Sequence, residues 1–141
     1  MSDTILEPKY YNLIFRTSCL TGVSSCYAIY KGQYAVGLGI MCVFLTSIHY
    51  WKYPDYSYRR YLDMAVTKTT VLYQFYTAIN AQYRYPYLYL WGIGILAYIY
   101  GIYQFSKKDY WKSTYCHMTL HIFGNAACIV LYSGYIGNEL V

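Results

Sequence analysis

The chain has 141 residues, of which 57% are hydrophobic and only 12% are charged, and its formal net charge is +5. Soluble proteins carry roughly 25% charged residues, so the composition argues against a water-soluble domain and indicates one integral membrane domain over residues 1–141. The basic residues are dispersed or flank apolar segments, which argues against nucleic-acid binding and favours contact with anionic lipid head groups.

Five apolar segments follow one another along the chain, each near the roughly 20 residues that a helix needs to cross the hydrocarbon core. They cover residues 10–30, 34–51, 60–79, 87–105 and 110–136. The sequence therefore predicts an all-α bundle of about five transmembrane helices, with Pro54 and Pro86 between helices and no cleavable signal peptide. The third segment contains Asp63 and Lys68, so it crosses only if its polar face meets other helices.

Small and aromatic residues support the same prediction. The fourth segment has no charged residue, and Gly92, Gly94 and Gly101 give it a face for close helix packing. Tyrosine occurs 23 times, which suits a chain with much surface near membrane interfaces.

Cysteine occurs five times, without a CxxC pair and inside apolar segments, so we expect buried, reduced thiols. These are Cys19, Cys26, Cys42, Cys116 and Cys128.

The loop charges predict the orientation of the bundle. With five crossings, the N-terminus, the second loop and the fourth loop lie on one side of the membrane. That side holds seven basic residues against two on the other, so the positive-inside rule places the N-terminus in the cytoplasm. The seven are Lys9, Lys52, Arg59, Arg60, Lys107, Lys108 and Lys112, and the two are Lys31 and Arg84.

Three histidines and one acid reach the cytoplasmic layer of this topology. His117 and His121 are four residues apart and share a helix face, with Ser113 and Asn125 continuing that stripe. His49 ends the second segment, and Asp63 begins the third from the same side. Ionisable groups inside a bilayer cost on the order of 3 kcal/mol each and usually have partners or a function.

The spacing predicts a metal site. Two histidines at i and i+4 can bind one ion, and a third from another helix makes a three-histidine zinc centre with an open position for water. In this hypothesis His49, His117 and His121 hold Zn²⁺, and Asp63 orients a ligand or accepts a proton from the bound water.

A structural reading of the same residues is the main alternative. His121 alone suits an interhelical hydrogen bond, and His49, beside Tyr50 and Trp51, suits an interfacial aromatic position. Asp63 lies four residues after Arg59 and can pair with it. The polar residues then form a network that only holds the helices together.

The order of these residues resembles the CREST superfamily of membrane hydrolases, which includes alkaline ceramidases and the adiponectin-receptor-like (PAQR) proteins. The matching stretches are "TSIHYW" with Ser47 and His49, "RRYLDM" with Asp63, and "CHMTLH" with His117 and His121. The resemblance implies zinc on the three histidines, and catalytic assistance by Ser47 and Asp63 in the hydrolysis of an amide such as ceramide.

The chain departs from that family in two respects. The family has a core of seven helices, whereas this chain has room for five. Its serine usually precedes the histidine by one turn, whereas Ser47 is two residues before His49, so their side chains point to different faces and Thr46 is a substitute. The stretch "SIHYWKYPDYSYRRYLDM" also resembles small multi-pass proteins of large DNA viruses and protists.

Three functions therefore remain open. The first is a zinc-dependent intramembrane hydrolase of a lipid amide or ester. The second is a structural or assembly protein, in a virion membrane or as a subunit of a membrane complex, and the third is a haem protein with His49 and His117 as ligands. All three make membrane lipids the main partners and place the chain in a membrane, either an endomembrane or that of a virion.

Overall fold

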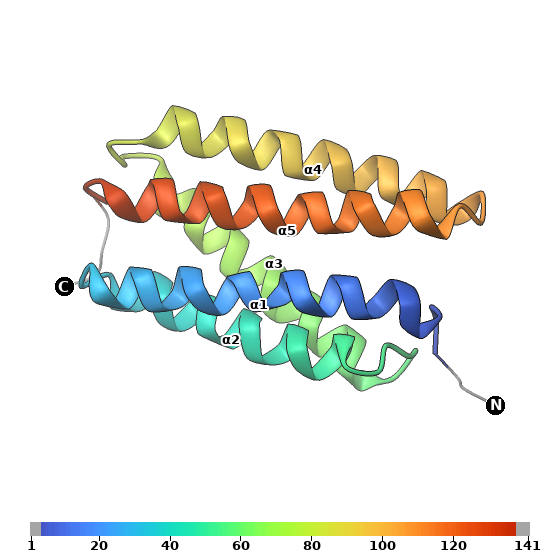
Figure 1. Ribbon diagram of the computed structural model, residues 1–141. Helices are drawn as coiled ribbons and strands as arrows, with labels where there is room; N and C mark the ends of the chain where they lie inside the picture. The colour runs from blue at the N-terminus through green and yellow to red at the C-terminus, as the bar shows by residue number, and fades with distance from the viewer. Residues whose placement is uncertain (1–3, 138–141) are drawn as a thin grey trace.

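The computed structural model describes residues 4–137, which form five α-helices and no strand (Figure 1). The helices are α1 (Pro8–Tyr30), α2 (Tyr34–Trp51), α3 (Tyr58–Ala78), α4 (Arg84–Ser106) and α5 (Tyr110–Ser133). The predicted all-α class and the five helices are confirmed for this part of the chain. The bounds lie within a few residues of those expected from the apolar segments.

Local signals explain where the helices begin. Pro8 opens α1, where its fixed φ suits the first turn and its missing N–H has no helical acceptor in any case. The side chains of Ser57 and Asp109 accept hydrogen bonds from backbone N–H groups in the first turns of α3 and α5. Pro86 was expected between helices but lies in the first turn of α4, which tolerates proline for the same reason as α1.

Two helical hairpins form the body of the molecule (Figure 1). In one, α1 and α2 run antiparallel around a turn at Gly32, whose φ of 78° lies in the left-handed region. In the other, α4 and α5 run antiparallel around a turn at Lys108, whose φ is 62°. Helix α5 packs on α1 and joins the hairpins, while α3 packs mainly on α2 and crosses behind the other helices at an oblique angle.

Glycine allows α4 to approach α5 closely. A Cβ atom added to Gly101 would lie 2.8 Å from Cβ of Cys116, and one added to Gly94 would lie 3.5 Å from Leu120. These two glycines therefore form the predicted packing face. Gly92 does not belong to it, because no atom lies within 4 Å of its added Cβ.

The described interior is unusually polar. Serine, threonine and glutamine side chains are buried on α1, α2, α3, α4 and α5 alike. They are Ser18, Thr21, Ser24, Ser25, Ser47, Thr70, Gln74, Thr77, Gln104 and Thr114, together with Gln33 in the turn between α1 and α2. Many of them hydrogen-bond across helix pairs, as Ser25 Oγ does to the Gly37 carbonyl at 2.7 Å.

The exterior is correspondingly apolar, and every helix exposes tyrosine together with leucine or isoleucine. Two of the described helices, α2 and α4, are long and apolar enough to cross a membrane.

The five cysteines are free thiols, as expected, but the expectation that they are buried holds only for Cys128. Cys116 is half-buried, whereas the remaining three thiols are on the exposed faces of α1 and α2.

The predicted charge asymmetry corresponds to the two ends of the bundle. The start of α1, the α2–α3 turn and the α4–α5 turn lie at one end, and the other two turns lie at the opposite end (Figure 1). The seven basic residues named above fall at the first end or within one helical turn of it, and Lys31 and Arg84 fall at the second.

Candidate functional site

Asp63 on α3 is held by two hydroxyl groups of α2. Ser47 Oγ donates a hydrogen bond to Asp63 Oδ1 at 2.7 Å, and Thr46 Oγ1 donates to the same oxygen at 3.0 Å. Ser47 is buried and the Asp63 side chain is half-buried. The structure therefore brings the two predicted catalytic residues together, and it adds Thr46, the substitute that the helix spacing suggested.

His117 and His121 also lie side by side. Their ring centroids are 4.9 Å apart and the rings are inclined by 30°, as expected for residues one turn apart on α5. The ring of Trp51, from the end of α2, contacts His117 at a centroid distance of 4.9 Å, and Tyr98 of α4 contacts it at 5.6 Å. Aromatic rings from two other helices therefore pack on this histidine pair.

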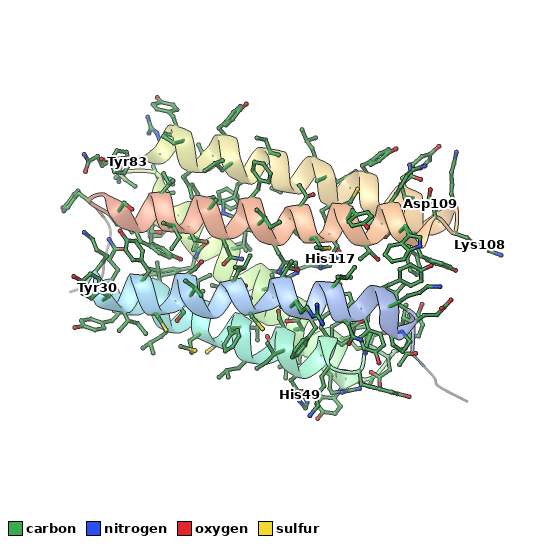
Figure 2. All side chains as sticks on the ribbon, viewed as in Figure 1. Tyr30, His49, Tyr83, Lys108, Asp109 and His117 are labelled. Atoms are coloured by element: carbon green, nitrogen blue, oxygen red, sulfur yellow. The ribbon has the colours of Figure 1, made fainter. Side chains whose placement is uncertain are left out.

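His49 does not join them. Its side chain is exposed and lines an open groove with Asn12, Phe15 and Leu45 of α1 and α2. Figure 2 shows His49 at the outer edge of α2, whereas His117 lies beside α5 within the bundle. Residues two positions apart on a helix point about 200° away from one another, so α2 cannot direct both Trp51 and His49 towards α5.

This geometry does not fit a three-histidine zinc centre. In residues 4–137, no group of three or more His, Cys, Asp or Glu side chains is placed so that it could hold a metal ion. The expected convergence of His49 with His117 and His121 is therefore not observed, and zinc binding stays a prediction. The haem hypothesis has the same difficulty, because it requires His49 and His117 to face one another.

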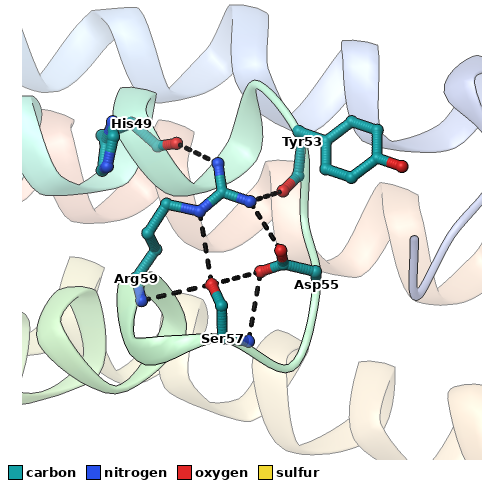
Figure 3. A network of polar contacts seen from close by, with 5 residues as sticks. All are labelled: His49, Tyr53, Asp55, Ser57 and Arg59. Carbon is teal, nitrogen blue, oxygen red and sulfur yellow. Dashed lines mark hydrogen bonds and ion pairs between the residues drawn. The ribbon is translucent and has the colours of Figure 1, made fainter. Parts of the chain in front are cut away.

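Arg59 has a different partner from the one considered for it. It forms an ion pair with Asp55 at 2.7 Å instead of with Asp63, and it donates to the backbone carbonyls of His49 and Tyr53 (Figure 3). The hydroxyl and the backbone N–H of Ser57 both donate to the Asp55 carboxylate. The Ser57 hydrogen bond and then Arg59 lower the pKa of Asp55 below its usual value. This network fixes the α2–α3 turn.

A second polar contact between distant helices was not anticipated. Gln74 of α3 and Tyr132 of α5 are fully buried, and the Gln74 side-chain amide donates to the Tyr132 hydroxyl. Cys128 Sγ lies 3.5 Å from the Gln74 side-chain oxygen. The signal in the sequence is the polar stripe of Thr70, Gln74 and Thr77, whose helical spacing marks one face of α3.

Asn125, expected to extend the histidine stripe, connects α5 to α1 instead of completing an ion site. Its side-chain oxygen accepts a hydrogen bond from Ser24 at 2.7 Å, and its amide donates to the His121 carbonyl at 2.7 Å and to Thr21 at 3.4 Å. The polar residues therefore form separate contacts between helices, not one cluster around a common point.

Comparisons with known proteins do not extend these observations. The sequence matches no protein-family model, and it resembles no curated protein and no solved structure closely enough to count as a match. The likeness to the CREST superfamily accordingly stays an expectation that depends on three short stretches.

Proposed function

We propose that this chain is a multi-pass membrane protein without a catalytic role, which crosses the bilayer five times and acts as a structural or assembly subunit of a membrane complex. In this proposal the basic end of the bundle faces the cytoplasm. The bundle itself is the functional object, and its polar residues hold the helices in register.

The composition of the α4 surface carries this proposal. The only residues that α4 buries in the described bundle are Tyr87, Gly94, Gly101 and Gln104. Most of its aliphatic side chains are exposed, namely Leu88, Ile95, Leu96, Ile99 and Ile102. A soluble helix does the reverse and buries its aliphatic face. An exposed apolar surface of this extent is typical of contact with lipid or with another membrane protein.

The interior supports the same conclusion. Between membrane helices, packing of small residues and hydrogen bonds replaces the hydrophobic effect as the source of association. The described helix pairs have these features, with Gly101 against Cys116 for α4 and α5, and Ser24 against Asn125 for α1 and α5.

Cysteine labelling of the two ends tests the topology. In a variant with all five native cysteines replaced by alanine, a single cysteine is introduced at Lys107 or at Lys31, which lie at opposite ends of the bundle. In cells of which only the plasma membrane is permeabilised, we expect a membrane-impermeant maleimide to label Lys107→Cys at the cytoplasmic end, and to label Lys31→Cys only after detergent opens the internal membranes. Equal labelling at both positions, or extraction of the chain by alkaline carbonate, would refute the proposed topology.

The non-catalytic part of the proposal is tested by metal analysis. Protein purified without chelator is compared with His121→Ala and with His49→Ala. Since His49 lies apart from the α5 pair, we expect no stoichiometric zinc in the wild-type protein and no difference among the three. Zinc at one equivalent that is lost in both variants would restore the hydrolase hypothesis and contradict this proposal.

A further inference from the structure

One face of α3 is left without a partner in the described bundle. Its exposed side chains recur at helical spacing and form a stripe along the whole helix, which we call the α3 stripe. Leu72, one turn from the centre of this stripe, is 69% exposed, and Tyr61 and Tyr76 at its two ends are 64% and 58% exposed. The α3 stripe consists of Tyr61, Met64, Ala65, Lys68, Leu72 and Tyr76.

Lys68 lies at the middle of this apolar stripe. It is exposed and forms no ion pair in residues 4–137. The acids described there are engaged elsewhere, since Glu7, Asp55 and Asp109 pair with other bases. Asp63 accepts the α2 hydroxyls and is five positions from Lys68, on a different face of α3.

The depth of Lys68 makes its exposure to lipid alone costly. It is ten residues from Tyr58 and ten from Ala78, the two ends of α3, which places it about 15 Å from each end at 1.5 Å per residue. The hydrocarbon core is about 30 Å thick, so Lys68 lies near its midplane. A lysine stem reaches the interface from a helix end but does not cover this distance.

We propose that the α3 stripe is a docking surface for a transmembrane helix of another membrane protein, which places an aspartate or glutamate against Lys68 at the bilayer midplane. This inference rests on the proposed membrane topology. A carboxylate is the complement of an unpaired cation in a medium without water. Ala65 and Thr69, on the same flank of α3, are small enough for the partner backbone to approach.

A second copy of this chain does not meet the requirement. Two copies insert with the same orientation, so a twofold contact through the α3 stripes would bring Lys68 against its own equivalent. Like charges at that depth repel, and nothing between them supplies a counter-charge. Anionic lipid head groups lie at the membrane surface and not at the midplane. The partner is therefore a different chain with an acidic residue inside a membrane span.

The test uses the full-length protein in lipid vesicles and a synthetic helix of roughly 20 leucine and alanine residues with one aspartate at its centre. A second helix carries asparagine at that position, and energy transfer between labelled helix and labelled protein reports binding. We expect the aspartate helix to bind about tenfold more tightly than the asparagine helix, as for an interhelical polar contact of ordinary strength.

Two variants locate the interaction. Lys68→Met should abolish the preference for aspartate while keeping the length of the side chain, and Lys31→Met, outside the helices, should leave it intact. An unchanged preference in Lys68→Met, equal binding of both helices to the wild type, or energy transfer showing that the protein pairs with itself through α3, would each overturn the inference.

Alkaline extraction of the same vesicles distinguishes a failure of the proposed membrane function from a failure of the docking inference. If the protein is extracted, the proposed membrane function fails and the inference fails with it. If the protein resists extraction but shows no preference for the aspartate helix, only the inference fails. Circular dichroism of Lys68→Met in the vesicles shows whether that variant keeps its helices, so that loss of folding is not mistaken for loss of the partner.

Discussion

The contact between α4 and α5 gives the sharpest prediction about stability, because two glycines of α4 differ in a single respect. Gly101→Ala and Gly92→Ala both replace a helical glycine and gain about 1 kcal/mol of helix propensity. A methyl group at Gly101 would lie 2.8 Å from Cβ of Cys116, whereas one at Gly92 would meet no atom within 4 Å. The difference between the variants therefore isolates the packing of α4 on α5.

The magnitude follows from the shortfall in distance. Carbon atoms pack at about 3.5–4.0 Å, so the helices must separate by roughly 1 Å to accept the methyl group at Gly101. Overpacking of this kind costs about 1–3 kcal/mol. We expect Gly92→Ala to raise the free energy of unfolding slightly. The free energy of unfolding of Gly101→Ala should be about 1–3 kcal/mol lower than that of Gly92→Ala.

The measurement is reversible unfolding of the purified protein in mixed micelles with increasing SDS, followed by circular dichroism. A double-mutant cycle with Cys116→Gly provides the control, because that change removes the Cβ atom that the new methyl group meets. Gly101→Ala should then be less destabilising by about 1–3 kcal/mol in the Cys116→Gly background. Equal stability of the two alanine variants would mean that α4 and α5 are not in close contact at Gly101.

Three further predictions follow from single contacts. Lys108→Gly should raise the free energy of unfolding by about 0.5 kcal/mol, because glycine relieves the left-handed φ of 62° at the α4–α5 turn; an equally large gain from Lys108→Ala would contradict this. Gln74→Leu should cost about 1–3 kcal/mol by removing the amide that donates to the buried Tyr132 hydroxyl, and adding Tyr132→Phe should recover most of the loss; a double variant as unstable as Gln74→Leu would argue against the bond. The lowered pKa of Asp55 means that its stabilising effect is complete above about pH 4 and is lost as pH falls through the folded-state pKa; unfolding measured between pH 3 and pH 6 should show less acid sensitivity in Asp55→Asn.

The number and bounds of the helices could be predicted because they depend on local signals. Apolar stretches of the right length, the turns between them and the capping residues Ser57 and Asp109 all lie next to the elements that they define. The confirmed features, the all-α class and the five helices, are therefore those that local sequence signals define. Pro86 was misplaced only because proline both ends helices and opens them, and the sequence alone does not distinguish the two uses.

The candidate site depended instead on the rotation of each helix about its axis, which is a long-range property. The resemblance to the CREST superfamily assigned Ser47 and Asp63 to one site, and the spacing of four assigned His117 and His121 to one helix face. In the structure Ser47 contacts Asp63, and the two histidine rings lie side by side. It did not predict that α2 directs Trp51 at His117. A rotation of α2 by about half a turn exchanges an inward His49 for an inward Trp51, and both rotations leave the hydropathy of the segment unchanged.

The two charges of α3 have different environments in the described bundle. Asp63 is accommodated within the chain, since two hydroxyl groups of α2 donate to its carboxylate. Lys68, near the middle of the same helix, has no corresponding partner among residues 4–137 and faces outwards among apolar side chains. If α3 spans the bilayer as proposed, the carboxylate that Lys68 lacks has to come from a second protein, so we expect α3 to be the helix through which the bundle contacts its partner.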